Sequence, residues 1–297
     1  MIGVEWGTGS FRAFRIAQDG SVRDRRISPR GFLQVPDARF GETLREEIGP
    51  WLAAGESRVL LCGMIGSRQG WKLAPHVPCP AGPAELAAGL VDIGFDWATV
   101  KLVPGAAATD VSGVVELMRG EETQVLGVPA LLRDGGLACL PGPHARWVTV
   151  RGGRIVGFTT HMTGDAYAAL RGCTALVRTM RDGPQDAAPF DAGVTRSGQP
   201  GGLLHHVFGV RAENLAGRLT DAEAPAYLFG ILVGHEVRAA LAMDPGAVVQ
   251  VIGPPDQTAL YARAIAACGG YAERHDGEAV IRGLALIGAH AAWTTQG

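Results

Sequence analysis

The chain has few cysteines, and they show no pairing pattern. Its 297 residues include five cysteines, at positions far apart in the sequence and never spaced C-x-x-C. An odd and scattered set argues against a disulfide framework and against a zinc knuckle. The thiols are typical of a protein kept in a reducing compartment, so we expect a cytoplasmic location.

A strong charge of one sign is also missing. The 27 Lys and Arg against 29 Asp and Glu leave a net charge of -2. Without a basic field, nucleic acid and anionic membranes are poor partners. The first residues include charges at Glu5, Arg12 and Arg15 instead of an export signal, and no uncharged apolar run reaches the roughly 18 residues of a membrane span. We expect a soluble protein that binds a small solute.

Several familiar catalytic motifs are absent. The sequence contains no G-x-x-x-x-G-K-[ST], no G-x-G-x-x-G that opens a helix, no H-E-x-x-H and no G-x-S-x-G. A P-loop enzyme, a Rossmann dinucleotide enzyme, a zinc protease and an α/β-hydrolase are therefore unsupported.

Two similar groups of short strands are present instead. Each consists of a strand, a glycine loop, a strand, a tight turn and a strand. They comprise residues 2–6, 11–17 and 21–27, and residues 136–140, 146–150 and 154–161. Such an internal repeat predicts two similar α/β domains that face each other across a ligand-binding cleft, with domains at 1–132 and 133–297.

Other elements follow from hydrophobic periodicity. We expect buried strands at 58–66, 99–103 and 248–253 and a short last strand at 271–275. We expect helices at 40–54, from 119–120 through LGVPALL, over most of 165–242 apart from a surface loop at 182–202, from Asp256 (as N-cap) to about 267, and at 278–293. The last helix is apolar enough to pack at the domain junction.

The first glycine loop is Gly7-Thr8-Gly9-Ser10. Two residues without Cβ let main-chain N–H groups approach a ligand closely, and two hydroxyls can add hydrogen bonds, so the turn suits a phosphate. Glu5 would repel that phosphate unless a cation lay between them, which makes it a candidate ligand of Mg²⁺, directly or through water. An ordinary tight turn with a solvated strand-end glutamate explains the same residues.

The second glycine loop, LPGPHARW, takes the equivalent place in the second group of strands. Gly142 could bring backbone donors to the other end of a polyphosphate, and His144 could add a charge-assisted bond. A structural histidine is the alternative for His144 alone. The repeat favours a pair of phosphate loops.

Two further segments contain candidate chemistry. In ELMRGEETQVLG, the acids Glu116, Glu121 and Glu122 lie around the expected start of a helix, where the helix dipole alone would favour them. One of them could instead accept a hydroxyl proton during phosphoryl transfer. After the strand at 58–66, a long loop holds Arg68, Trp71 and Lys72, which suit an anionic sugar, although a solvated loop fits equally.

Together these segments resemble the 2-dehydro-3-deoxygalactonokinase family, sugar-acid kinases of the actin/hexokinase/Hsp70 superfamily. The resemblance depends on six ordered blocks, VEWGTGSFRAF, LCGMIGSRQGWKLAP, ELMRGEETQVLG, LPGPHARWV, HMTGD and GILVGHEV. It implies two duplicated ribonuclease-H-like domains with ATP in the cleft. It also implies ATP- and Mg²⁺-dependent phosphorylation of the terminal hydroxyl of 2-dehydro-3-deoxy-D-galactonate, in galactonate catabolism.

The resemblance also assigns roles to residues. It implies a catalytic base at Glu121 or Glu122 and a metal contact at Glu5. The nucleotide would bind at Gly7, Thr8, Gly9, Ser10, Gly142, His144, Gly253 and Asp256, of which the last two lie at the adenosine. The sugar acid would bind at Ser67, Arg68, Trp71, Lys72 and Arg119.

The chain also departs from the family pattern. Glu5 replaces an aspartate, Pro143 replaces a threonine in the second loop, and Pro254-Pro255 stiffens the adenosine loop. A longer acid can displace a metal that demands octahedral geometry. Two alternatives therefore stay open: a kinase of another sugar acid or sugar, and a regulator that binds nucleotide or sugar acid without turnover. A homodimer also stays open.

Overall fold

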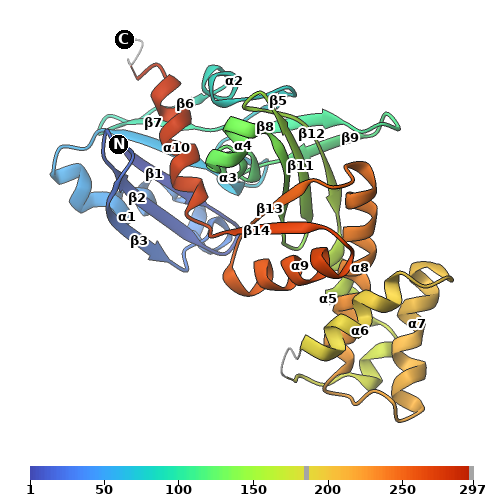
Figure 1. Cartoon of the computed structure of the whole chain (residues 1–297). Coiled ribbons are helices and arrows are strands. Elements are labelled where there is room, and N and C mark those ends of the chain that lie inside the picture. The colour runs from blue at the N-terminus through green and yellow to red at the C-terminus, as the bar shows by residue number, and fades with distance from the viewer. Residues whose placement is uncertain (184–186, 294–297) are drawn as a thin grey trace. The chain divides into compact units, whose positions relative to one another are not determined.

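The computed structural model describes residues 1–183 and 187–293 (Figure 1). The chain divides into two compact units. Unit 1 contains residues 1–135, 148–158 and 277–297, and unit 2 contains residues 136–147 and 159–276.

Unit 1 is built on a six-stranded sheet of order β3-β2-β1-β4-β7-β6. The predicted antiparallel meander is confirmed as β1 (Ile2–Trp6), β2 (Phe11–Ile16) and β3 (Val22–Ser28). Parallel pairing then adds β4 (Arg58–Cys62) and β7 (Thr99–Leu102), and β6 (Val91–Ile93) closes the sheet antiparallel to β7. The apolar side chains of β1 and β4 pack in one core with Leu44 and Ile48 of α1 (Phe40–Ala53), the predicted helix.

A second, three-stranded sheet in unit 1 was not predicted. It contains β5 (His76–Pro78), β8 (Gly105–Thr109) and β9 (Val115–Met118), in the order β5-β8-β9. The β8 sequence GAAAT lacks the β-branched and aromatic residues that mark a strand, so its pairing with β5 and β9 is decided by tertiary context. Glu116 consequently lies on β9, and its predicted place at a helix start is wrong.

The strand predicted for 58–66 ends early, at Cys62. Gly63 has φ +96°, outside the extended region, and a short 3₁₀ turn, η3 (Met64–Gly66), follows it. Similar short turns are η1 (Phe32–Gln34) and η2 (Pro36–Ala38).

The helix predicted from 119–120 onward is two helices. They are α3 (Glu121–Val125) and α4 (Pro129–Asp134), and Pro129 begins the second, where its missing N–H costs nothing. Gly127 separates them at a tight contact with α10 (Ala279–His290), since a Cβ there would lie 1.7 Å from the Ala279 carbonyl oxygen. The remaining helix of unit 1 is α2 (Pro83–Ala88).

A third sheet has five strands in the order β12-β11-β10-β13-β14. As predicted, β10 (Gly136–Leu140), β11 (Ala145–Arg151) and β12 (Arg154–His161) form consecutive strands, and β13 (Val248–Ile252) and β14 (Tyr271–His275) extend the sheet in parallel from β10. The outer part of the β11–β12 hairpin belongs to unit 1, where Ile155 pairs with Ala81. The order of the five-stranded sheet is similar to β3-β2-β1-β4-β7 of the six-stranded sheet, because in both the first three strands stand in reverse chain order and two later strands follow. The edge strand β6 has no counterpart in the five-stranded sheet.

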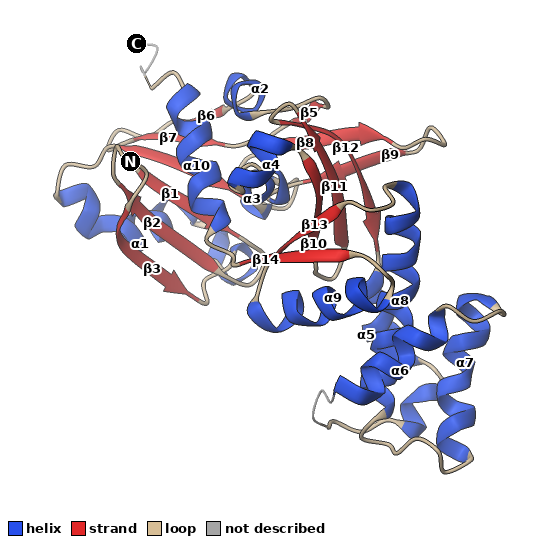
Figure 2. Ribbon diagram, in the orientation of Figure 1, coloured by secondary structure: helices blue, strands red, loops and turns tan. Residues whose placement is uncertain are grey.

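The helices of unit 2 include a group formed by α5 (Thr163–Cys173), α6 (Ala187–Ser197), α7 (Gly202–Leu215) and α8 (Ala224–Met243), with η4 (Ala175–Thr179) (Figure 2). The loop predicted at 182–202 is wrong over 187–197. There α6 buries Phe190 and Val194 against α8, an apolar spacing that the Gly, Pro and Asp of the segment had concealed. Residues 184–186 of that prediction lie outside the described residues.

Among the described helices, α8 alone is long and apolar enough to cross a membrane, by length and composition. Of its apolar window, 61% is buried inside the structure, and its Leu228, Ile231 and Val233 lie in the cores of unit 2. The helix after β13 is α9 (Pro255–Ala267). Its N-cap is Pro254, so the predicted N-cap role of Asp256 is wrong, and Asp256 lies within the first turn.

Candidate active site

The carboxyl ends of β1 and β4 define one edge of the sheet in unit 1. These strands are parallel neighbours, with Glu5 beside Cys62. The turn 7–10 follows the first strand and the segment 63–72 follows the second, so both predicted binding segments begin at the same edge. Ligands of open α/β sheets bind outside the carboxyl ends of parallel strands.

The turn 7–10 is supported from one side. Gly7 N–H donates to the Ser10 carbonyl at 2.9 Å and closes the hairpin. The carbonyls of Gly7 and Thr8 accept from Phe32 and Leu33 at 3.0 and 3.4 Å. Since C=O and N–H of a trans peptide point in opposite directions, the N–H groups of Thr8 and Gly9 point away from 32–33.

Gly31 makes this support possible, although no motif in the sequence marks it as part of the site. A Cβ at Gly31 would lie 2.2 Å from the Thr8 carbonyl oxygen and 2.4 Å from Gly9 Cα. Thr8, Gly9 and Ser10 are exposed, and a Cβ built on Gly9 meets nothing within 4 Å. The turn therefore has a fixed base and an open outer face, which is the arrangement that a phosphate loop needs.

A glycine contact brings the acidic segment to the same edge. A Cβ on Gly63 would lie 2.9 Å from the carbonyl oxygen of Trp6, the residue before the turn. A Cβ on Gly120, the residue before Glu121, would lie 3.1 Å from Gly63 Cα. Trp6, Gly63 and Gly120 thus pack backbone to backbone, and α3 begins beside the ends of β1 and β4.

The two candidate bases have different surroundings. Glu122 is 1% exposed, and its two oxygens accept from the Gly120 N–H at 2.9 and 2.7 Å, with a further bond from Thr123 Oγ1. Burial, followed by the charge of Glu121, raises the pKa of Glu122 to about 8. Glu121 is half-buried, and its Oε2 accepts from the Arg119 N–H at 3.1 Å. Glu121 alone of the two reaches solvent.

Glu5 already has partners within unit 1. Arg12, opposite Glu5 in the β1–β2 register, donates to Glu5 Oε2 through Nε at 2.5 Å and also through Nη2. Gln124 Nε2 donates to Oε1 at 2.9 Å. A carboxylate offers about four lone-pair sites, of which these bonds use three. The group therefore fits a contact to a metal-bound water better than direct ligation, and no cluster of three acidic, His or Cys groups was found in the described part of the chain.

The segment 67–72 divides into two sets of side chains. The Trp71 ring stacks on Phe40 at 6.0 Å in the aromatic core, and Lys72 Nζ donates to the Asp92 carbonyl at 2.7 Å. These contacts give both side chains structural partners, and their predicted contact with substrate stays a prediction. Arg68 is exposed.

Ser67 and Arg119 differ from these residues. In the described residues, Ser67 Oγ and Arg119 Nη1 are buried without a hydrogen-bond partner. Arg119 Nη2 donates to the Ala74 carbonyl at 2.8 Å. Buried polar atoms nearly always have partners, so two such atoms in one region mark a place where a ligand or an ordered water would bind.

In unit 2, the second glycine loop packs on the start of α5. Asp165 N–H donates to the Pro143 carbonyl at 3.1 Å, and a Cβ on Gly164 would lie 2.7 Å from the Gly142 carbonyl oxygen. His144 Nε2 and Asp165 Oδ2 are 2.7 Å apart, and both side chains are about half exposed. The HMTGD block therefore supports the loop that contains Gly142.

A buried carboxylate beneath this loop was also missed. Glu236 of α8 accepts from Trp147 Nε1 at 2.8 Å, from Tyr261 Oη at 3.0 Å and from Thr163 Oγ1. Burial raises the pKa of Glu236. The four residues, called here the Glu236 cluster, join β11, α5, α8 and α9. The GHEV block contains the glutamate, but its apolar surroundings conceal this role in the sequence.

The predicted adenosine residues lie near the second loop. Gly253 follows β13 with φ +152°, and a Cβ there would lie 3.9 Å from Pro141 Cδ. Its N–H donates to the His275 carbonyl at 3.1 Å. Because β10 and β13 are parallel neighbours, Gly142, Gly253 and the first turn of α9 with Asp256 belong to one edge of the sheet.

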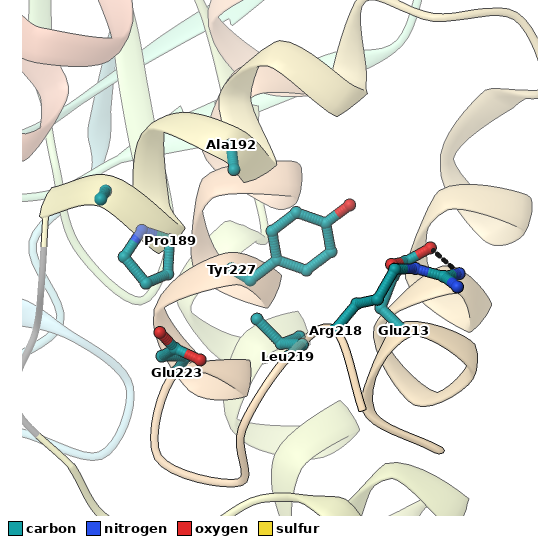
Figure 3. Close-up of a pocket in the computed structure, with 8 residues that line it drawn as sticks. Pro189, Ala192, Glu213, Arg218, Leu219, Glu223 and Tyr227 are labelled. Carbon is teal, nitrogen blue, oxygen red and sulfur yellow. Dashed lines mark hydrogen bonds and ion pairs between the residues drawn. The ribbon is translucent and has the colours of Figure 1, made fainter. Parts of the chain in front are cut away.

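One cavity, of about 350 Å³, lies elsewhere in unit 2 (Figure 3). It lies among α6, α7 and α8, and the Glu213–Arg218 ion pair lies at its wall. None of the sequence-predicted site residues lines it. Its lining residues are Ala188, Pro189, Ala192, Glu213, Arg218, Leu219, Glu223 and Tyr227.

Solved structures identify the fold. The activator of 2-hydroxyisocaproyl-CoA dehydratase from Clostridium difficile, with bound ADPNP, is 11% identical, covers 98% of this chain and 95% of its own, and has a TM-score of 0.51. Component A of (R)-2-hydroxyglutaryl-CoA dehydratase from Acidaminococcus fermentans is 10% identical, covers 96% of each chain and has a TM-score of 0.50. The predicted α/β fold of the actin-like ATPase class is confirmed.

Closer relatives identify the family. The 2-keto-3-deoxy-galactonokinase family model matches residues 5–287. A probable 2-dehydro-3-deoxygalactonokinase of Rhizobium meliloti (strain 1021) is 34% identical over 297 residues, which cover 98% of this chain and 96% of the relative. A crystal structure from Sinorhizobium meliloti, described as a candidate enzyme of the same name, is 32% identical, covers 97% of each chain and has a TM-score of 0.88.

The chain therefore belongs to the 2-keto-3-deoxy-galactonokinase family. The predicted enzyme class, a carbohydrate kinase, is confirmed, and membership in a kinase family implies that the chain uses ATP.

Proposed function

We propose that this kinase transfers the γ-phosphoryl group of ATP to the terminal (6-) hydroxyl of 2-dehydro-3-deoxy-D-galactonate, with Mg²⁺. The observation that supports it best is the contact of Gly63 with both Trp6 and Gly120. This contact places the turn 7–10, which suits a phosphate, and the carboxylate of Glu121 at the same edge of the sheet. Phosphoryl transfer depends mostly on such positioning, together with charge stabilisation and a group that accepts the hydroxyl proton.

The turn 7–10 would bind phosphate through the N–H groups of Thr8 and Gly9 and the hydroxyl groups of Thr8 and Ser10. Its carbonyl side is occupied by Phe32 and Leu33, so the donors face the open side. We assign the other phosphates to Gly142 and His144 in unit 2 and the adenosine to Gly253 and Asp256. The order that the five-stranded sheet shares with β3-β2-β1-β4-β7 supports domain duplication, and we place the boundary at 132/133.

We assign the proton acceptor to Glu121. A base must come within hydrogen-bond reach of the proton that it abstracts, and geometry takes precedence over pKa. Glu122 is buried, and its carboxyl oxygens accept from the Gly120 N–H. We therefore assign Glu122 a structural role, in which it stabilises the backbone at Gly120 before α3. The sugar acid would bind near Ser67, Arg68 and Arg119, on the same side of the sheet edge as α3.

Glu5 would hold Mg²⁺ through a metal-bound water, consistent with the lone pair that Arg12 and Gln124 leave on its carboxylate. When bound, Mg²⁺ neutralises phosphate charge that builds up during transfer. Arg12 and Gln124 hold the Glu5 carboxylate through hydrogen bonds to both of its oxygens. A cytoplasmic location agrees with the five free cysteines of the structure.

The test is release of ADP by the purified protein with ATP, Mg²⁺ and a panel of 2-keto-3-deoxy sugar acids. We expect turnover with 2-dehydro-3-deoxy-D-galactonate above all others. No ADP release with any member would overturn the proposal. Thermal stabilisation by ATP or sugar acid without turnover would instead favour a binding protein that lost catalysis.

A further inference from the structure

A cationic side chain in unit 1 has an unsatisfied, buried nitrogen. Arg119 is half-buried, and a guanidinium taken out of water requires compensation by an anion or by hydrogen bonds. Nη2 donates to the Ala74 carbonyl at 2.8 Å and lies 3.2 Å from His76 Nε2. Nη1 is buried without a partner among the described residues. The guanidinium is thus held on one side and available on the other.

The unsatisfied nitrogen lies next to an unsatisfied hydroxyl. A Cβ built on Gly66 would be 3.1 Å from Arg119 Nη1, so this nitrogen lies against the residue that precedes Ser67. Ser67 Oγ is the other buried side-chain atom of this region without a partner in the residues that the structure describes. Arg119 Nη1 and Ser67 Oγ can both donate hydrogen bonds, so together they suit a ligand group that has only acceptors.

His76 fixes the direction of the guanidinium. Arginine has only donors, so the facing Nε2 must accept, which requires a neutral ring with its proton on Nδ1. Burial and the charge of Arg119 lower the pKa of His76, which keeps the ring in this neutral form. His76 is opposite Gly105 in the β5–β8 register, and a Cβ on Gly105 would lie 2.4 Å from His76 Cδ2. The His76 ring therefore packs directly against the backbone of Gly105, which restricts its rotation.

We propose that Arg119 Nη1 and Ser67 Oγ bind the carboxylate of the sugar acid, and that His76 is a positioning residue that orients Arg119 for this contact. This inference rests on the proposed function and specifies which end of the substrate is recognised. A carboxylate has acceptors for both donors, and a charge-assisted bond to Arg is among the strongest in proteins. Arg119 directly precedes the Gly120 turn and Glu121, so the acid end is bound next to the segment that contains the proton acceptor.

The test compares the free sugar acid with its methyl ester, which lacks the charge. Calorimetry gives the dissociation constant of each ligand for the wild type and for Arg119→Lys, Ser67→Ala, His76→Ala and His76→Gln. We expect the wild type to prefer the acid by about thirtyfold or more, as for a charged hydrogen bond. Arg119→Lys should remove most of this preference, because a single ammonium nitrogen replaces the two guanidinium nitrogens, of which Nη2 contacts Ala74 and His76 and Nη1 would contact the carboxylate. Ser67→Ala should reduce it severalfold.

The histidine variants separate positioning from a merely structural role. His76→Ala should raise KM for the acid with little change in kcat and with unchanged affinity for ATP. His76→Gln supplies an amide oxygen that accepts from Arg119, so it should restore most of the preference for the acid. The matched control is Arg133→Lys, because Arg133 is 71% exposed and pairs with Asp134.

An acid-to-ester ratio that stays at the wild-type value in folded Arg119→Lys protein would overturn the proposal, even if the wild type phosphorylates the acid. Failure of the proposed function gives a different result, the absence of ADP release by the wild type. Calorimetry needs no turnover, so it judges the carboxylate site in both cases.

Discussion

Glu5 and Arg12 face each other across the first hairpin, with Arg12 Nε 2.5 Å from Glu5 Oε2. The pair flanks the turn 7–10, one residue on β1 and the other on β2. The glutamate that follows the buried residues of β1 is therefore compensated by a guanidinium within its own hairpin, and Gln124 from α3 completes its contacts.

The first prediction concerns this pair. Glu5→Gln should lower kcat/KM for ATP by about tenfold or more and raise the Mg²⁺ concentration required for half-maximal activity, because it removes a charge that orients Arg12 and the metal-bound water. Kinetics over a Mg²⁺ titration measure both effects. Arg15→Lys is the control, since Arg15 lies on β2 together with Arg12 but pairs with Glu56. Unchanged Mg²⁺ dependence in Glu5→Gln would contradict the assignment.

The second prediction concerns pH and Glu122. Its pKa is about 8 in the folded protein against an ordinary value of 4.5. Between these values the folded state binds more protons than the unfolded state, so the free energy of unfolding falls as pH rises from about 4.5 to about 8, by on the order of 1.4 kcal/mol per pKa unit. Glu122→Gln imitates the protonated form and should flatten this part of the stability curve.

Chemical denaturation of both proteins at several pH values measures the difference. Groups common to both proteins cancel in the comparison, which leaves the ionisation of Glu122. Parallel curves for wild type and Glu122→Gln would show that the carboxylate does not titrate in this range.

The third prediction concerns the support of the turn 7–10. Gly31→Ala should reduce kcat/KM for ATP by at least about tenfold, because its Cβ would overlap Thr8 and Gly9 and displace the turn by the small distances that matter for positioning. Gly49→Ala is the matched control. Its Cβ meets nothing within 4 Å on α1, so it should keep activity and gain about 0.5–1 kcal/mol of stability. Equal activities of the two variants would refute the role of Gly31.

The fourth prediction concerns the Glu236 cluster. Glu236→Leu leaves the buried Trp147, Tyr261 and Thr163 donors without their acceptor, at about 1–3 kcal/mol each. We expect a total loss of several kcal/mol of stability, measured by denaturant titration. Glu236→Gln keeps one acceptor oxygen and should lose less, and the exposed Glu46→Gln should be close to neutral. Equal stability of the leucine and glutamine variants would contradict the network.

Much of the fold could be predicted because its signals are local. The two strand meanders, α1, β13 and β14 follow from alternation, apolar spacing and glycine turns within about ten residues. Elements that depend on distant partners could not be predicted. The alanine-rich β8 becomes a strand through pairing with β5 and β9, and α6 forms where its apolar stripe meets α8.

By itself, the sequence determined the loops that hold the candidate chemistry and the family to which the chain belongs, since both depend on residue types in fixed order. Only the tertiary structure decided the surroundings of each group. It separated the half-buried Glu121 from the fully buried Glu122 and paired Glu5 with Arg12 and Gln124. Within the described residues, it left Arg119 Nη1 and Ser67 Oγ without hydrogen-bond partners. The physical reason is that burial and hydrogen bonding depend on segments such as 5–12, 63–76 and 119–124, which are brought together only by packing.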